Sequence, residues 1–509
     1  MYSIVSTAIV RGIQSIPVCV EADVSDGMPI FEMVGFLASE VKEAKERVRT
    51  ALRNAGYVLP PKRITVNFTP ADIRKSGSGF DLPIAVAVLA AMGSVPKEAL
   101  DGVFVIGEIG LNGDIQPVHG VLPMIAEAKE RGICRCIIPA GNRREAGLVQ
   151  DVTVFGARRI GEVIQLLTEG EWKEESIYNM EETVQGGQQP DFADIHGQRL
   201  LKRACEVAVT GMHNLLLIGP PGAGKTMMAM RIPSILPPLL REEQMELSKI
   251  YSVGGLLTEE NGLLKERPFR APHHTISMQG LTGGGAVPKP GEISLAHKGV
   301  LFLDELPEFQ KETLEILRQP LEEKCVRLVR LYGSYEYPAD FMLVAAMNPC
   351  RCGYYPDVQK CRCTQTAITR YLERISQPLL DRIDICVEAP QVTFRELTET
   401  GHEETSEVIR KRVIDAQKMQ QERYKEETFC YNSQIPAMRI REFCGLNRKQ
   451  EAYMEQIYRK LALTARSYHK LLKVARTLAD MEGEDRIADR HLNEAICYRS
   501  LDRKFWDRG

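Results

Sequence analysis

The feature that most constrains this chain is a glycine-rich loop between an apolar strand and a helix. Residues 215–218 are continuously apolar, and residues 227–232 have a helical pattern. The loop between them matches G-x4-G-K-[ST] in the structural setting that this motif requires. Its members are Gly219, Pro220, Pro221, Gly222, Ala223, Gly224, Lys225 and Thr226. Backbone N–H groups of such a loop, together with the start of the following helix, hold phosphate oxygens.

A second motif predicts that the bound nucleotide is ATP with Mg²⁺ and that it is hydrolysed. The apolar residues 300–303 end in Asp304 and Glu305. We expect Lys225 to neutralise the β and γ phosphates, and the Thr226 hydroxyl to ligate Mg²⁺. Asp304 is placed to hold the same ion through water, and Glu305 to polarise the attacking water.

A third apolar strand, 341–346, leads to Asn348. An amide at the carboxyl end of a central strand can orient the lytic water or sense the γ-phosphate. The alternative is that Asn348 is an ordinary turn residue. Apolar strands that alternate with helices predict a parallel sheet covered on both faces, which is an α/β fold.

The chain has 509 residues, which is enough for about three domains. We predict an α+β domain over 1–168, a polar linker over 169–190, the nucleotide-binding α/β core over 191–395 and a helical domain over 396–509. Mixed strand and helix patterns fill the first region, and almost all signals after residue 395 are helical.

Composition narrows the class of protein. The net charge of -3 gives no general basic surface for coating nucleic acid, although a ring that holds DNA only in its pore would escape this objection. No apolar run approaches the length of a membrane span, so we expect no membrane partner. The start of the chain lacks a signal-peptide pattern, which predicts a cytoplasmic location and reduced cysteines.

Four cysteines gather in the loop 350–363, as two C-x-C pairs that contain Cys350, Cys352, Cys361 and Cys363. Four thiolates in a short loop suit a tetrahedral structural Zn²⁺ site. Four free, buried cysteines are the alternative.

These motifs resemble the AAA+ family and, within it, the magnesium-chelatase-like ComM/YifB group. The resemblance covers nearly the whole chain and is carried by residues 194–198, 270–275, 283–285, 290–297, 303–308, 317–322, 346–350 and 378–384. It implies that Arg382 is an arginine finger reaching the ATP of a neighbouring subunit, and that Arg466 is the sensor arginine of the helical lid. A finger supplied in trans implies a closed ring, and the family implies a hexamer. The alternative for Arg382 is an ion pair with Asp381 or Asp384.

The same resemblance favours a DNA motor, because ComM-like proteins act as branch-migration helicases in recombination and natural transformation. The DNA would be bound without sequence preference. A magnesium-chelatase-type motor subunit and an ATP-driven protein remodeller are the alternatives. The ATPase motifs alone do not separate the three.

The N-terminal region resembles a Lon-protease-like domain of the ribosomal S5 domain 2-like fold. Gly79 falls at the position of the nucleophile and Leu122 at the position of the lysine, so the Ser–Lys pair is missing and we expect no peptidase activity. Ser78, one residue away, is interpreted as a turn residue.

Two segments of the core are candidate pore loops for DNA: the insert 276–289, with its Gly283-Gly-Gly285 tip, and the hairpin 324–337. A glycine tip lets backbone approach a phosphate chain closely. Arg327 and Arg330 lie three residues apart and cannot share a face of an ideal strand. Lys289 is a third candidate phosphate contact, and an exposed hairpin with solubilising charges is the alternative.

Overall fold

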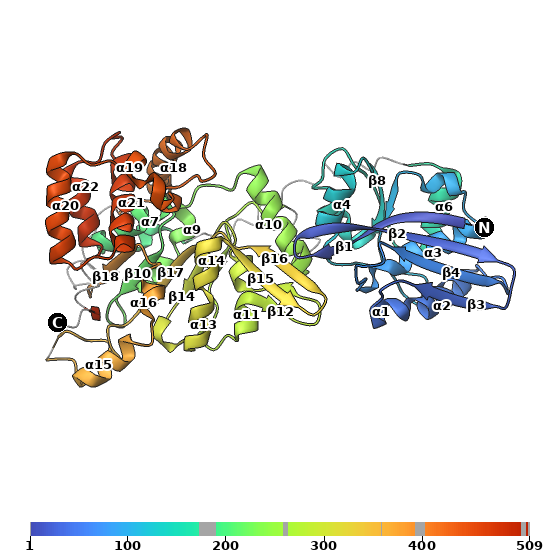
Figure 1. The fold of residues 1–509 in the computed structure, drawn as a ribbon, viewed down its shortest axis with the longest axis horizontal. Helices are drawn as coiled ribbons and strands as arrows, with labels where there is room; N and C mark the ends of the chain where they lie inside the picture. The colour runs from blue at the N-terminus through green and yellow to red at the C-terminus, as the bar shows by residue number, and fades with distance from the viewer. Residues whose placement is uncertain are drawn as a thin grey trace.

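The computed structural model describes residues 2–172, 190–257, 263–357, 359–391, 403–499 and 505–506. Figure 1 shows an elongated molecule, with the N-terminal domain at one end and the C-terminal helices at the other. Most of the predicted linker 169–190, and the boundary at residue 395, lie outside the described residues. The domain limits therefore stay predictions.

The N-terminal domain is built on a seven-stranded sheet of order β3-β4-β2-β1-β5-β8-β9. Alternation in β4 puts Ile64, Val66 and Phe68 in the core and the residues between them toward the other face. The strands are β1 (Tyr2–Arg11), β2 (Gln14–Ser25), β3 (Ile30–Val34), β4 (Arg63–Thr69), β5 (Val103–Val105), β8 (Arg135–Pro139) and β9 (Thr153–Ala157), with a small ribbon of β6 (Glu108–Ile109) and β7 (Ile115–Gln116).

One helix of this domain, α3 (Asp81–Ala91), is buried along its whole length and packs on β1 and β2. Its apolar sequence explains this position, because a helix that is hydrophobic all round must lie in a core. Asp81 at its start pairs with Arg47, with 2.8 Å between the carboxylate and Nε. The other helices are α1 (Ser39–Lys42), α2 (Ala44–Asn54), α4 (Val121–Glu130), α5 (Arg143–Ala146) and α6 (Ile160–Glu169).

The central domain holds a five-stranded, all-parallel sheet of order β11-β14-β17-β10-β18. Leu215 and Leu217 of β10 (Leu215–Ile218) enter one apolar core, and Leu216 and Ile218 enter another on the opposite face. The prediction of a parallel sheet covered on both faces is therefore confirmed. Its other strands are β11 (Phe269–Arg270), β14 (Val300–Leu303), β17 (Met342–Met347) and β18 (Ile385–Glu388).

Helices and two small hairpins surround this sheet. The hairpins are β12 (Gly283–Gly284) with β13 (Lys289–Pro290), and β15 (Cys325–Arg330) with β16 (Gly333–Pro338). The helices are α7 (Arg199–Gly211), α8 (Lys225–Ala229), α9 (Ile232–Ile235), α10 (Arg241–Gly254), α11 (Met278–Thr282), α12 (Glu292–Leu295), α13 (Lys311–Ile316), α14 (Arg318–Glu323), α15 (Gln365–Leu372) and α16 (Gln377–Leu380).

The C-terminal region is helical, as expected, and packs against α7 of the core through α18 and α21. Its helices are α18 (Ser406–Arg423), α19 (Ile440–Phe443), α20 (Arg448–Lys460), α21 (Ala465–Met481) and α22 (Asp489–Cys497). Within the described part of the chain, no helix is both long enough and apolar enough to cross a lipid bilayer.

Contacts between the N-terminal domain and the core include those at α10 and at the β15–β16 hairpin. Ser252 of α10 donates a hydrogen bond from Oγ to the buried Glu145 carboxylate at 2.6 Å, and its carbonyl accepts from Gly120 N at 3.1 Å. The turn of the β15–β16 hairpin lies against the N-terminal domain, where the Tyr332 ring contacts the Arg74 guanidinium, 3.9 Å from the ring centroid. Figure 1 shows this hairpin reaching toward β1.

Candidate nucleotide-binding site

The glycine-rich loop joins β10, a central strand of the sheet, to α8, which begins at Lys225. Gly219 tolerates no side chain, because a Cβ atom there would lie 2.3 Å from the Ala389 carbonyl oxygen. Gly224, just before the helix, has a φ of +81°, which favours glycine. The sequence thus holds the loop close to the sheet, with the start of the helix facing the carboxyl edge of the strands.

Lys225 is brought together with Asn348, as the sequence predicts for two residues of one site. Its Nζ donates hydrogen bonds to the Gly219 and Pro220 carbonyls at 2.8 and 2.9 Å, and to Asn348 Oδ1 at 3.1 Å. Asn348 follows β17, the neighbour of β10, so both residues lie at the same edge of the sheet. Burial lowers the pKa of Lys225.

Thr226 and Asp304 meet at the same edge. The Thr226 hydroxyl donates to the Asp304 carboxylate at 2.6 Å, and the other oxygen of that carboxylate accepts from Glu305 N at 2.9 Å. A hydroxyl and a carboxylate are the hard oxygen ligands that Mg²⁺ prefers. These two residues therefore fit the ion of a bound Mg·ATP.

Glu305 adopts a left-handed conformation, with φ at +52°. A non-glycine residue in this region carries strain of roughly 1–3 kcal/mol, and such strain concentrates at functional sites. The conformation directs its side chain toward a cavity of about 300 Å³ that is also lined by Thr226 and Asp304. A carboxylate in this place can accept a proton from an attacking water.

His274 is a member of this site that sequence reasoning did not single out. Its Nδ1 lies 3.5 Å from the Glu305 carboxylate, and its ring packs against His273 and Phe309. The signal in the sequence is a pair of histidines within residues 270–275, one of the segments that carry the family resemblance. That signal does not indicate which strand end the pair faces, so the contact could be found only in three dimensions.

Arg382 and Arg466 lie together, but not at the P-loop of their own chain. The two guanidiniums contact one oxygen of Glu322, at 2.7 and 2.8 Å. Arg382 is 8% exposed and also donates to the Arg318 carbonyl at 3.2 Å. The predicted alternative is an ion pair of Arg382 with Asp381 or Asp384. This prediction is wrong, because the Arg382 guanidinium pairs with Glu322 instead. The three residues line a cleft between the core and the C-terminal helices.

The four cysteines of the loop 350–363 form one cluster, with all four sulfur atoms within 4.8 Å of one another. The Sγ–Sγ distances are 3.3 Å for Cys350–Cys352, 3.8 Å for Cys350–Cys361 and 3.6 Å for Cys352–Cys361. Four thiolates around Zn²⁺, with Zn–S near 2.3 Å, have sulfurs about 3.8 Å apart. The donor set therefore fits zinc. The loop also packs on the P-loop, because a Cβ at Gly353 would meet Pro221 Cδ at 2.3 Å.

The protease-like region of the N-terminal domain lacks the catalytic pair. Gly79 has no side chain, and Leu122 is buried in the apolar core. The Ser78 hydroxyl donates a hydrogen bond to the Glu108 carboxylate. Among the described residues, no lysine amine is hydrogen-bonded to Ser78.

The fold and the site together define a P-loop protein of the AAA+ class. Family models match three parts of the chain: "Magnesium chelatase, subunit ChlI" over 191–397, "Subunit ChlI of Mg-chelatase" over 20–142, and "Magnesium chelatase, subunit ChlI C-terminal" over 403–499. The competence protein ComM of Haemophilus influenzae is 42% identical over 496 residues, with 96% of each chain covered. The protein YifB of Escherichia coli is 41% identical, covering 98% of this chain and 97% of its own.

The chain belongs to the ComM/YifB family of magnesium-chelatase-like AAA+ ATPases that carry an N-terminal Lon-protease-like domain. The archaeal Lon protease of Pyrococcus abyssi is 30% identical over 158 residues, which is 30% of this chain and 16% of the protease. The family implies the use of nucleotide and Mg²⁺, in agreement with the arrangement of Lys225, Thr226 and Asp304.

Proposed function

We propose that this protein hydrolyses ATP as a hexameric ring of identical subunits, and that the ring moves along DNA to drive branch migration in recombination. Lys225, Thr226 and Asp304 hold Mg·ATP, Glu305 activates the water, and Asn348 orients it. Each of these side chains comes from the carboxyl edge of one sheet, which supports a single reaction centre.

The observation that supports a ring of subunits is the position of Arg382 and Arg466. Arg382 and Arg466 meet at Glu322, and neither makes a hydrogen bond or ion pair with the P-loop among the described residues. A transferring phosphoryl group requires stabilisation of charge on its oxygens, and an arginine supplied by another subunit provides this. The neighbouring subunit therefore completes the site.

Two observations support DNA as the substrate of the motor: the family to which the chain belongs, and one surface of the core. The relative from H. influenzae is named a competence protein. The glycine tip and the β15–β16 hairpin lie side by side, since a Cβ at Gly284 would lie 3.4 Å from Arg330 Nη2. Arg327 is already paired with Glu323 and Glu336, both at 3.0 Å, which makes Arg330 the better phosphate contact. The hairpin's contact with the N-terminal domain restricts the DNA-binding surface to its exposed side.

The chelatase descriptions of the family models give the competing function, a motor subunit that acts with a porphyrin. One experiment separates the two: steady-state ATP turnover of the purified full chain with single-stranded, duplex and branched DNA, and with a porphyrin. Stimulation by DNA, together with ATP-driven movement of a three-strand junction, is expected. The variant Glu305→Gln, which should bind ATP without turning it over, is the control. A wild type that responds only to porphyrin would overturn the DNA assignment.

We propose further that Cys350, Cys352, Cys361 and Cys363 hold one structural Zn²⁺. The cluster follows β17 and Asn348 directly, and its loop packs on Pro221. A metal that cross-links this loop would fix the outer wall of the P-loop. Metal analysis of protein purified without chelator tests the proposal.

A further inference from the structure

A cavity of about 310 Å³ lies between the N-terminal domain and the core. Its walls come from both: the end of β1, residues 76–80 and the loop 117–120 on one side, and Val253, the insert and the hairpin on the other. The volume is at the lower end of the range for ligand pockets. It occupies the region where Gly79 and Ser78 replace a protease centre, and it is separate from the nucleotide site. Lys289, a candidate phosphate contact in the sequence, lines this cavity.

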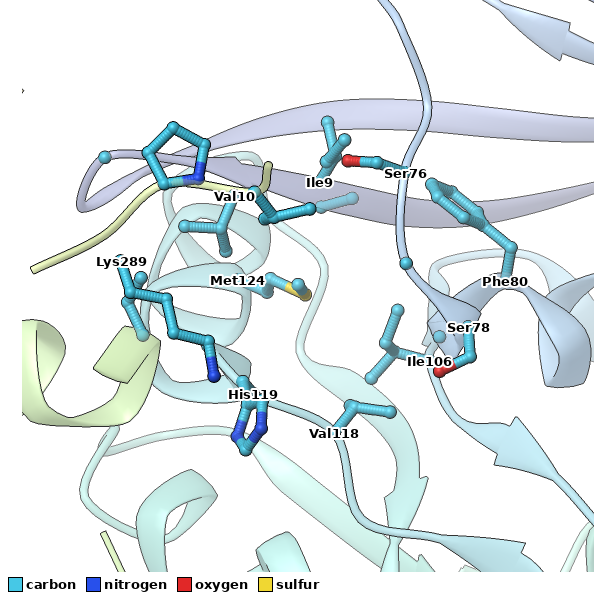
Figure 2. A pocket seen from close by; sticks show the side chains of 18 of the residues that line it. Ile9, Val10, Ser76, Ser78, Phe80, Ile106, Val118, His119, Met124 and Lys289 are labelled. Carbon is cyan, nitrogen blue, oxygen red and sulfur yellow. The ribbon is translucent and has the colours of Figure 1, made fainter. Parts of the chain in front are cut away.

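The polar groups of the cavity have opposite character at its two ends. Figure 2 shows Lys289 beside His119 at one end and Ser78 at the other, with Met124 and Ile106 between them. No carboxylate lies within ion-pair distance of Lys289 among the residues that the structure describes. Burial and the Lys289 ammonium lower the pKa of His119, so the ring is neutral at pH 7 and can accept or donate a hydrogen bond. This end favours an anionic group.

The opposite end of the cavity favours a ligand that supplies hydrogen-bond donors. The Glu108 carboxylate accepts a hydrogen bond from the Ser78 hydroxyl and keeps further lone pairs for N–H groups. Between the ends the walls are apolar, which suits an aliphatic side chain. A ligand that matches this order has a carboxylate, then an apolar side chain, then N–H donors.

One wall of the cavity is an open strand edge. β1 pairs with β2 along its whole length, from Tyr2 to Arg11, whereas β5 meets its other side only at Ser6↔Phe104. Beyond this point, Ala8, Ile9 and Val10 line the cavity, and no strand of the described chain pairs with that side. An unpaired edge presents backbone N–H and C=O groups to an extended peptide.

We propose that this cavity binds the C-terminal end of a partner polypeptide in extended form. The terminal carboxylate lies on the Lys289 ammonium, one apolar side chain fills the space beside Met124 and Ile106, and the peptide backbone runs along β1. Because the peptide contacts both domains at once, its binding strengthens their association. The wall beside His119 is joined to α10 by the Gly120–Ser252 hydrogen bond. Peptide binding in the cavity is therefore transmitted to α10 of the core.

The experiment uses the full chain and two labelled hexapeptides that differ only at the terminus. Both end in Ala-Leu-Val, one as the free acid and one as the amide, and binding is measured by fluorescence polarisation. The free acid should bind at least about tenfold more tightly, which is the effect of one charge-assisted hydrogen bond. Lys289→Met should reduce the affinity for the acid to that for the amide, and leave the amide unchanged.

Two further variants separate charge from shape. Lys311→Met removes a lysine outside the cavity and should change neither affinity. Val287→Trp, at a position that is 53% exposed, narrows the cavity and should weaken both peptides. Unchanged melting temperatures establish that the variants are folded.

Equal binding of acid and amide, or an affinity for the acid that survives Lys289→Met, would overturn the proposal. So would binding of a dT10 oligonucleotide that is lost in Lys289→Met while neither peptide binds, because the cavity would then be a nucleic-acid contact. Failure of the DNA-motor assignment would leave these peptide results unchanged.

Discussion

One oxygen of Glu322 accepts from both Arg382 and Arg466, at 2.7 and 2.8 Å. The proposed arginine finger, Arg382, and the proposed sensor arginine, Arg466, are thus held by a carboxylate of their own chain. In the proposed ring, the γ-phosphate of a bound ATP would compete with this carboxylate for the guanidinium donors.

Arg382→Ala should lose about 10³–10⁵ of the turnover rate while ATP affinity is retained, because the finger acts on the transition state. Lys225→Ala should also be inactive, but because its own P-loop lacks the lysine that neutralises the ATP phosphates. Mixed rings of the two variants contain interfaces in which an intact P-loop meets an intact Arg382, and ATPase assays of mixtures should recover part of the activity. Absence of recovery at every mixing ratio would contradict a finger in trans.

Glu322→Gln should lower the ATP concentration that gives half-maximal turnover. Since Glu322 is 46% exposed, solvent screens its ion pairs and limits their contribution to about 1 kcal/mol, so the shift should be at most about fivefold. Glu315→Gln, which breaks the nearby pair with Arg318, is the matched control. An unchanged or raised half-saturating concentration in Glu322→Gln would count against competition between carboxylate and phosphate.

Arg330→Ala should weaken DNA binding for all sequences and reduce the salt slope by about one, as expected for the loss of one phosphate contact. Arg327→Ala should have a smaller effect, because Glu323 and Glu336 already neutralise this arginine. Titrations at several salt concentrations measure both slopes. Equal slopes in the two variants would remove the assignment of Arg330 to DNA.

Cys361→Ser should abolish a content of about one zinc per chain and weaken ATP binding, because the loop packs on Pro221. Cys430→Ser, an exposed cysteine outside the cluster, should retain the metal. Elemental analysis and nucleotide titration give the two readouts. A zinc-free wild type with full ATPase activity would disprove the metal site.

Asp340 should make stability depend on acid pH. Burial raises the pKa of its carboxyl, but the ammonium groups of Lys324 and Lys298 outweigh burial and lower the pKa from 3.8 to about 2. Its contribution, on the order of 2 kcal/mol, is therefore present above the unfolded pKa and is lost as pH falls through 3.8 toward 2. Asp340→Asn should lower the melting temperature at pH 7, and the gap to wild type should narrow from about pH 5 downward. A gap that is independent of pH would contradict the ionic role.

The P-loop, Asp304 and Asn348 could be predicted from the sequence because their positions follow from a local rule: the carboxyl ends of parallel strands share an edge. Their convergence needs only the strand order. The contacts His274–Glu305 and Glu322–Arg382 have no such rule, since they join side chains whose approach depends on the packing of separate elements. The docking of Tyr332 on Arg74 is similar, because charge and periodicity in the hairpin indicate exposure but not which surface it meets.

That docking also limits how the protein can move. The hairpin is held to the N-terminal domain by Tyr332 on Arg74 and by a hydrogen bond from Arg11 to the Ser334 carbonyl at 3.0 Å. A displacement of the hairpin during an ATP cycle must either carry the N-terminal domain with it or break these contacts. In the first case, each displacement of the hairpin moves the whole N-terminal domain, together with its cavity.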